Sequence, residues 1–229
     1  MESTRLPGKV LKLIGAYPTV YHVYHRARMA VPNTVVVIPA TAANDPLAAY
    51  LVCQDVATFR WDGPVEDVLG RYEAALQTFP GDPVVRITAD CPFLDPTLIA
   101  ECLHRYRQQD SDSTYVSNTC HRTYPRGLDV EVFSRRLLEA AHALAMKPHD
   151  REHVTPMIRA LARHTVGILA PRNHSAYRWT LDTPDDLAWC RAVADAVGAL
   201  PPDPTPHTLL ALLDRRPELR RYDAAPLSR

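Results

Sequence analysis

Residues 83–92 read P-V-V-R-I-T-A-D-C-P, an apolar run that ends in an aspartate, Asp90, and a proline turn. The β-branched start of this run predicts a strand that is buried on both faces. A second run of this kind, T-V-V-V-I, occupies residues 34–38. Residues 65–79, between the two runs, have the apolar spacing of a helix. The alternation predicts an α/β fold, with a mostly parallel sheet and helices on both faces.

The rest of the chain continues this alternation of helices and strands. Residues 128–133 (L-D-V-E-V-F) alternate as a half-exposed strand should. The further expected helices and strands are helices over 18–30, 95–106, 134–145, 151–163 and 184–197, and strands over 113–117, 165–169 and 177–181. We expect one main domain over residues 1–200. Residues 201–229 read as a proline-rich linker, a short helix and a basic tail, which we expect to be dispensable for chemistry.

The composition narrows the class of protein. The chain has 229 residues and a formal net charge of zero, which disfavours a general nucleic-acid binder. No apolar run approaches the length of a membrane span, and the polar N-terminus has no signal-peptide pattern, so we expect a cytoplasmic protein. The five cysteines are scattered and never form a C-x-x-C pair, which favours free thiols over disulfides or a zinc site.

Two acidic residues follow predicted strands at the edge where α/β sheets bind ligands. Asp90 follows the strand predicted at the start of residues 83–92. Asp182 follows the strand predicted over 177–181, within W-T-L-D-T-P-D-D-L at residues 179–187. Carboxylates in this position suit a magnesium ion. Asp90 could equally cap the following turn. Thr183 and Asp185 could cap the helix over residues 184–197, but such capping does not require Asp182.

The N-terminal segment S-T-R-L-P-G-K at residues 3–9 combines hydroxyls and cations on a loop with proline and glycine. Arginine and lysine both suit phosphate oxygens. The alternative is a solvated tail. A Walker A loop is excluded, because the earlier glycine is missing and a valine follows the lysine.

Two further patterns are less specific. Residues 124–131 (Y-P-R-G-L-D-V-E) gather polar groups on a turn that leads into a strand, and an ordinary hairpin turn explains them equally well. Residues 149–153 (H-D-R-E-H) match the H-x-x-E-H pattern of some zinc proteases. This match is short and confined by Pro148 and Pro156, so coincidence is the preferred interpretation.

Seven segments, in order, resemble the cytidylyltransferases of the SpsF type, relatives of CMP-KDO and CMP-sialic acid synthetases. They are S-T-R-L-P-G-K-V, D-P-L-A, E-D-V-L-G-R-Y, V-V-R-I-T-A-D-C-P, Y-P-R-G-L-D-V-E-V-F, R-E-H-V-T-P and T-L-D-T-P-D-D-L. The likeness runs from residue 3 to about residue 220. It implies a Rossmann-like sheet and a small hairpin lobe, at about 119–170, that often makes a homodimer.

The resemblance also implies roles for individual residues. Asp90 and Asp182 are the expected ligands of Mg²⁺, and Arg5 and Lys9 are the expected catalytic cations that grip the nucleotide phosphates. Nucleotide binding is expected to involve Ser3, Thr4, Gly8, Arg71 and Arg86 as well. The acceptor is expected to contact Tyr124, Arg126, Asp129 and His153.

The function implied by the resemblance is a metal-dependent transfer of CMP from CTP to a sugar-like acceptor, releasing pyrophosphate, for cell-surface or spore polysaccharide synthesis. Another nucleotide in place of CTP is the alternative within enzymes. In the family, a strand ending in Gln-Ala-Arg-Met precedes the phosphate loop, and Met1 falls on that methionine. We therefore expect the first strand to be missing here and the complete enzyme to begin upstream. The alternative from another class is a non-catalytic nucleotide-binding or scaffold relative, inactive because that strand is absent.

Overall fold

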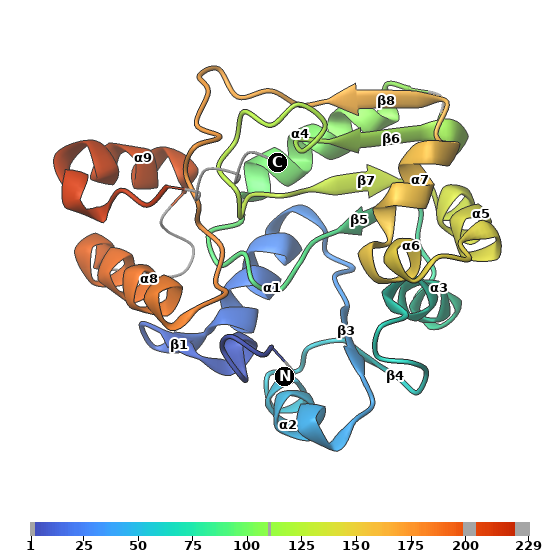
Figure 1. Cartoon of the computed structure of the whole chain (residues 1–229), viewed down its shortest axis with the longest axis horizontal. Coiled ribbons are helices and arrows are strands. Elements are labelled where there is room, and N and C mark those ends of the chain that lie inside the picture. The colour runs from blue at the N-terminus through green and yellow to red at the C-terminus, as the bar shows by residue number, and fades with distance from the viewer. Residues whose placement is uncertain (1–2, 110, 199–204, 223–229) are drawn as a thin grey trace.

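A computed structural model describes residues 3–109, 111–198 and 205–222 (Figure 1). Its largest sheet has four strands in the order β5–β7–β6–β8. Strand β7 runs antiparallel to β5 and β6, whereas β6 and β8 are parallel. The strands of this sheet are β5 (Val84–Arg86), β6 (Thr114–Ser117), β7 (Glu131–Phe133) and β8 (His164–Gly167).

Two smaller sheets have two strands each. The first is a parallel pair, β3 (Val36–Pro39) with β4 (Thr58–Trp61). The second is an antiparallel pair, β1 (Leu13–Ile14) with β2 (Tyr17–Pro18). Both directions therefore occur among the described strands. The α/β fold with helices around its sheets is confirmed.

Neighbouring residues of the four-stranded sheet enter opposite cores, because successive side chains of a strand point to opposite faces. Tyr115 and Phe133 pack in one core with α3 (Val68–Thr78), α5 (Arg135–Leu144) and α7 (Thr155–Leu161). Val116 and Val132 pack in the other core with α1 (Thr19–Ala30), α4 (Pro96–Arg107) and α8 (Pro184–Val197). The sheet is thus covered by helices on both faces.

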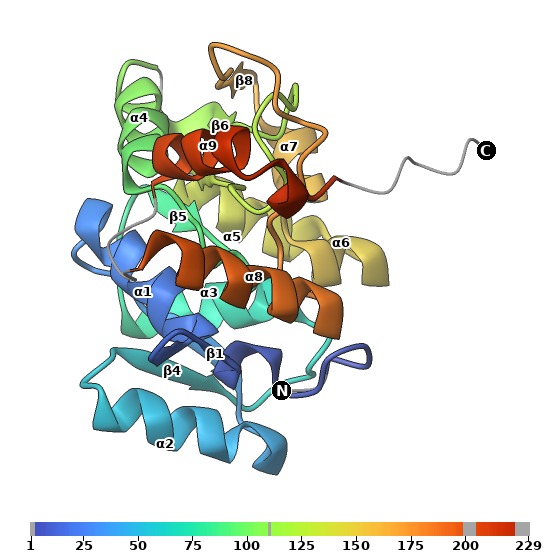
Figure 2. The same ribbon diagram turned by 90° about the vertical axis from the view of Figure 1, so that its left-hand side faces the viewer.

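Helix α2 (Asp45–Cys53) packs on the pair β3–β4, and Figure 2 shows it beneath these strands. The other helical segments are α6 (Pro148–His153), α9 (Pro206–Arg215), η1 (Lys9–Leu11), η2 (Ala42–Asn44), η3 (Ser111–Ser113) and η4 (Pro217–Leu219). Among the described residues, every helix is too short or too polar to cross a bilayer. All five cysteines carry free thiols.

Three local predictions are wrong. Strand β7 is completely buried rather than half-exposed, because strands pair with both of its edges and helices cover both faces. The expected helix over 151–163 is broken at Val154, whose φ of 65° is rare for a β-branched residue. Residues 177–181 form isolated bridges, Arg126 with Arg178 and Tyr177 with Tyr222, instead of a regular strand.

The C-terminal helix α9 is part of the main core. Leu209 and Leu213 are fully buried and belong to the same cluster as residues of α1 and α4. The Trp189 indole N–H donates to the Leu219 carbonyl at 2.6 Å, which fastens η4 to α8. Helix α9 and η4 therefore contribute to the main core of the fold. Residues 201–204, the rest of the expected linker, lie outside the described residues.

Candidate active site

The side chain of Lys9 joins the two acids that the sequence singled out. Its Nζ donates to Oδ2 of Asp90 and to Oδ1 of Asp182, each at 2.8 Å. Asp90 follows β5 and Asp182 precedes α8, and the Leu181 N–H donates to the Asp90 carbonyl at 2.9 Å. The two acids therefore converge on one ammonium group.

The loop that carries Lys9 depends on Gly8. Gly8 has a φ of 67°, a left-handed conformation that glycine adopts without strain, and it caps η1. Ser3 accepts a hydrogen bond from the Leu6 N–H at 3.3 Å, and Leu6 is buried. One buried anchor and one left-handed turn therefore direct Lys9 inward.

Charge pairing decides the protonation of this cluster. Burial alone would raise the pKa of Asp182, but hydrogen bonds from Lys9 and Arg178 lower it to about 2. Burial would lower the pKa of Lys9, and the attraction of Asp90 and Asp182 outweighs this and raises it. Near neutral pH the Lys9 side chain is therefore charged and the Asp182 carboxyl is ionised.

A second layer of charged residues holds Asp182 from behind. Arg178 donates to Oδ2 of Asp182 at 2.8 Å and to Asp186 at 3.2 Å. Oδ2 of Asp186 accepts the backbone N–H groups of Asp182 and Thr183, both at 2.8 Å. Thr183 is the N-cap of α8, as the sequence indicated, and it forms a capping box with Asp186, while Asp185 lies in the first turn. Arg221 completes the layer, 2.7 Å from Asp186.

A polar pocket of about 180 Å³ lies between the sheet and the loop after β6. Its lining residues are Arg86, Thr88, Thr119, Arg122, Asp129 and Glu131. Glu131 pairs with Arg86 and accepts the Tyr115 hydroxyl at 2.6 Å. Arg122 donates to both oxygens of Asp129, at 2.6 and 2.8 Å. Thr88 connects this pocket to the Asp90 loop through a 3.3 Å contact with Cys91.

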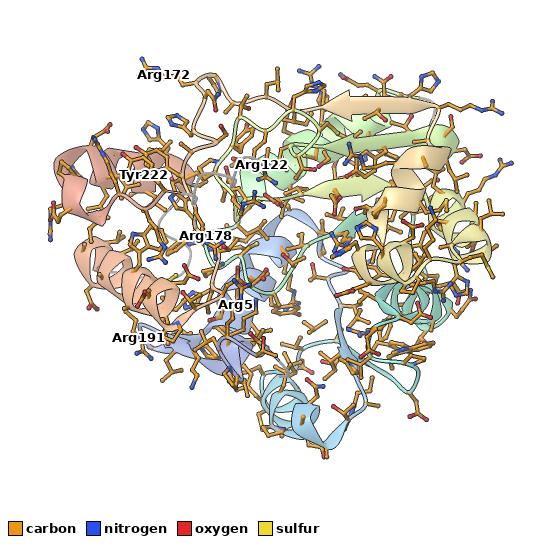
Figure 3. The ribbon with its side chains drawn as sticks, viewed as in Figure 1. Arg5, Arg122, Arg172, Arg178, Arg191 and Tyr222 are labelled. Atoms are coloured by element: carbon orange, nitrogen blue, oxygen red, sulfur yellow. The ribbon has the colours of Figure 1, made fainter. Side chains whose placement is uncertain are left out.

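Several predicted site residues lie either at the Lys9–Asp90–Asp182 cluster or at the polar pocket. Arg5 lies 3.8 Å from Asp182 and is 65% exposed, so it reaches the same carboxylate from the solvent side. Figure 3 labels Arg5 and Arg178 near the centre of the molecule and Arg172 far from them, at its edge. Thr4 is exposed on the loop between Ser3 and Arg5. Arg86 and Asp129, predicted for the nucleotide and the acceptor respectively, line one pocket.

The other predicted residues lie on different elements. Arg71, on α3, donates to the Val65 carbonyl at 2.5 Å. His153, on α6, is exposed and its ring packs against His149, with centroids 4.6 Å apart. Tyr124 is half-buried against the main core. Their roles in binding stay predictions.

Arg126 lies on the segment that crosses residues 177–179. Its N–H donates to the Tyr177 carbonyl at 3.0 Å, and its own carbonyl accepts the Trp179 N–H at 2.7 Å. The next residue, Gly127, has a φ of 106°, and a Cβ there would lie 2.7 Å from the Trp179 carbonyl carbon. This close crossing requires glycine, and the exposed side chain of Arg126 stays a predicted acceptor contact.

Several residues of the site were absent from the predicted set, among them Arg122, Glu131, Arg178, Asp186 and Arg221. Arg178 lies four residues before Asp182, and Asp186 four residues after it. A charged pattern around a strand-end acid could have indicated them. Glu131 was part of the quoted turn segment but was given no role. Arg122 carries no sequence signal that we can identify.

The donor set fits a magnesium ion. Two carboxylates from different elements point at one position, now shared by the Lys9 ammonium. Mg²⁺ is usually held by one or two carboxylates together with waters and substrate phosphates. The two acids therefore suffice as protein ligands, provided that a nucleotide brings its phosphates.

Comparison with known proteins decides the family. Residues 1–197 match the family described as cytidylyltransferase. The chain belongs to the cytidylyltransferase family. This cytidylyltransferase is 33% identical, over 229 residues, to the spore coat polysaccharide biosynthesis protein SpsF of Bacillus subtilis (strain 168), covering 95% of this chain and 92% of that protein. Membership supports an enzyme, a nucleotidyltransferase, over a non-catalytic relative.

Solved structures agree with this assignment. A cytidylyltransferase from Leptospira borgpetersenii serovar Hardjo-bovis (strain JB197) superposes with a TM-score of 0.88 at 25% identity, covering 98% of this chain and 94% of that one. A CMP:2-keto-3-deoxy-manno-octonic acid synthetase complexed with CTP gives a TM-score of 0.56 at 18% identity, over 84% of this chain and 94% of that one. The second likeness shows a shared fold. The prediction of a Rossmann-like cytidylyltransferase is confirmed.

Proposed function

We propose that this cytidylyltransferase transfers CMP from CTP to a hydroxyl group of a sugar-like acceptor and releases pyrophosphate, with Mg²⁺ as its metal. The observation that carries the proposal is the position of the Lys9 ammonium, 2.8 Å from both Asp90 and Asp182. A cation next to two carboxylates at a strand end suits the phosphates of a nucleotide and a divalent ion together. The spore-coat relative supports a role in polysaccharide synthesis.

The reaction requires little covalent chemistry from the protein. An acceptor oxygen forms a bond to the α-phosphorus and loses its proton, while the bond from that phosphorus to the pyrophosphate oxygen breaks. Lys9 and Arg5 neutralise charge on the phosphate oxygens as it develops. When bound, Mg²⁺ supplies further neutralisation of the same oxygens.

Residues around the acids hold them in place. Arg178 and the N-terminal box of α8 fix the carboxylate of Asp182, so that its direction changes little during turnover. Positioning of this kind accounts for much of the rate in reactions that lack a protein nucleophile.

The acceptor is assigned to the 180 Å³ polar pocket. This pocket pairs two guanidinium groups with two carboxylates and adds two hydroxyls, which are groups that hydrogen-bond to a polyhydroxylated sugar. Its connection to the Asp90 loop through Thr88 supports the proximity that transfer requires. A homodimer and a cytoplasmic location stay predictions.

Pyrophosphate release tests the proposal. The purified chain is assayed with CTP, UTP, ATP and GTP against a panel of sugar acids and sugar phosphates, with Mg²⁺ and with a chelator. The expected result is release that requires an acceptor and Mg²⁺ and is fastest with CTP. Faster release with another nucleotide would show that the enzyme prefers a base other than cytosine. Release undiminished by the chelator would contradict the dependence on Mg²⁺.

A further inference from the structure

The polar pocket assigned to the acceptor carries a balanced set of charges. Its lining holds two guanidinium groups and two carboxylates, so its formal charge is zero (Arg86, Arg122, Asp129 and Glu131). Two threonine hydroxyls complete the polar lining. The pocket is therefore rich in hydrogen-bonding groups but has no excess of either charge.

Each guanidinium group is already paired with a carboxylate of the same pocket. Arg122 donates to both oxygens of Asp129, at 2.6 and 2.8 Å. Arg86 pairs with Glu131, which also accepts the Tyr115 hydroxyl at 2.6 Å. The four charged side chains of the pocket are only 10–32% exposed, so solvent and salt screen these pairs less than surface pairs. An entering carboxylate or phosphate group would have to compete with an internal carboxylate for each arginine.

The carboxylates of the pocket keep room for hydrogen-bond donors. A carboxylate has about four lone-pair sites, and Arg122 occupies one on each oxygen of Asp129. A sugar hydroxyl donates as well as accepts, whereas an ionised acid group only accepts. A hydroxyl can therefore bind beside Asp129 without breaking its ion pair, and an ionised acid group is repelled there.

The side of the pocket towards the Asp90 loop is also negative. Thr88 contacts the Cys91 thiol at 3.3 Å, which places that thiol beside the pocket. Burial raises the pKa of this thiol, and the charges of Asp90 and Asp129 raise it further. An anionic acceptor that approached from this side would meet two carboxylates of like charge.

The cluster around Lys9 differs in its supply of cations. Lys9 also lies between two carboxylates, but Arg5, which is 65% exposed and 3.8 Å from Asp182, adds a second positive charge. Mg²⁺ is the proposed metal at the same carboxylates. The described lining of the polar pocket has no cation beyond its two paired arginines. The two places therefore suit different chemistry, namely phosphates at Lys9 and uncharged groups in the pocket.

We propose that the acceptor is an uncharged sugar, and that the two internal ion pairs of the pocket select against sugar acids and sugar phosphates. This inference rests on the proposed function, in which the pocket binds the acceptor. An ion that leaves water needs a partner of opposite charge, and a hydroxyl group does not. The volume of about 180 Å³ is below the roughly 300–1,000 Å³ of sites for drug-sized ligands, which suits a single sugar ring.

The experiment uses pairs of acceptors that differ in charge. Each sugar acid is compared with its methyl ester, and each sugar phosphate with the parent sugar. The full chain is assayed for CTP-dependent release of pyrophosphate with both members of each pair. The proposal expects kcat/KM to be at least about tenfold higher for the uncharged member. An equal or higher value for the charged member would overturn it.

Two variants should move this preference in opposite directions. Asp129→Asn removes the partner carboxylate of Arg122 and gives the pocket a positive charge, so the charged acceptors should gain about tenfold relative to the uncharged ones. Arg122→Gln gives the pocket a negative charge and should strengthen the preference for the uncharged member. Asp112→Asn, which breaks an exposed pair with Arg136, is the matched control and should leave the preference unchanged. A preference that stays constant in both pocket variants would contradict the proposal.

Binding measurements separate this proposal from the proposed function. If no acceptor releases pyrophosphate, the proposed transfer fails, and calorimetric titration of the same pairs then measures the pocket directly. Binding of the uncharged members that is at least about tenfold tighter supports selection by the ion pairs. Tighter binding of the charged members, or binding of neither, overturns it.

Discussion

Lys9 and Asp182 are 173 positions apart in the chain, yet Nζ of the lysine lies 2.8 Å from Oδ1 of the aspartate. The contact links the first loop to the N-terminus of α8, and Asp90 joins it from the end of β5. Three distant segments thus meet at one ammonium group. Because this group is central, its removal is the most direct test of the site.

Lys9→Ala should abolish most activity while leaving the fold intact. Without the ammonium, Asp90 and Asp182 face each other with less neutralisation, and the phosphate oxygens lose their nearest cation. We expect kcat to fall by roughly 10²–10³, the size seen when one group that stabilises transition-state charge is lost. Lys12→Ala, at an exposed position on the same loop, is the matched control. If Lys9→Ala turned over nearly as fast as the control, the proposed catalytic role of Lys9 would be wrong.

Asp182 should make part of the stability of the fold depend on pH. Its pKa is about 2 in the folded chain against an ordinary 3.8, so its stabilising effect is complete above about pH 4 and is lost as pH falls through 2. Asp182→Asn should therefore weaken the dependence of the free energy of unfolding on pH between pH 6 and pH 2.5. Denaturant unfolding at several pH values measures this, with Asp195→Asn, exposed on α8, as control. Identical pH slopes for Asp182→Asn and the wild type would contradict the assignment.

The regular elements could be predicted because local pattern decided them. The cap and first turn of α4 are an example: Asp95 accepts the Thr97 N–H at 2.9 Å and Pro96 follows it, as the sequence indicated. The burial of β7 could not be predicted, because it depends on β5 and β6, whose order in the sheet is not local information. The helix break at Val154 could not be predicted either, because no glycine or asparagine stands at the position with positive φ.

The residues of the site likewise divide into those that local sequence could predict and those that depend on tertiary contacts. Asp90 and Asp182 could be selected because strand ends are where α/β sheets bind ligands. Arg122 could not, since its partner Asp129 is seven residues away, across a loop of no recognisable type. Arg178 could have been suspected from its spacing to Asp182, but its contact with Asp186 depends on how the chain turns into α8.

Arg178→Gln should lower turnover without contacting substrate. The guanidinium holds Oδ2 of Asp182 and also contacts Asp186, so its loss frees the carboxylate to rotate. We expect kcat to fall by about 10–100-fold, as is typical when a residue that orients a metal ligand is removed. Affinity for Mg²⁺ should weaken in parallel, which a purely structural defect in α8 would not produce by itself. Arg172→Gln, exposed and distant in Figure 3, is the control.

Arg122→Ala should raise the KM for the acceptor and leave the KM for CTP unchanged. Arg122 orders Asp129 through two hydrogen bonds, and both line the polar pocket assigned to the acceptor. Losing a hydrogen bond to a charged group costs about 1.5–3 kcal/mol, so the KM should rise by roughly 10- to 150-fold. Initial rates measured against each substrate in turn separate the two effects. A rise confined to the KM for CTP would move the nucleotide into this pocket.

Removal of residues 198–229 should abolish activity as well as destabilise the fold, in contrast to the expectation from sequence. The deletion exposes core positions that Leu209, Leu212 and Leu213 cover, and each buried leucine contributes about 1.5–3 kcal/mol of a total stability of roughly 5–15 kcal/mol. It also removes Arg221, which lies 2.7 Å from Asp186 behind the site. Because the truncated chain also loses part of the core, Arg221→Ala is the sharper variant. Its apolar core is complete, so it should fold, with a lower unfolding temperature because the buried Asp186 loses one guanidinium partner, while kcat falls several-fold. His207→Ala, exposed on α9, serves as its control. Wild-type turnover in Arg221→Ala, together with an active truncated chain, would restore the view that the C-terminal segment is dispensable.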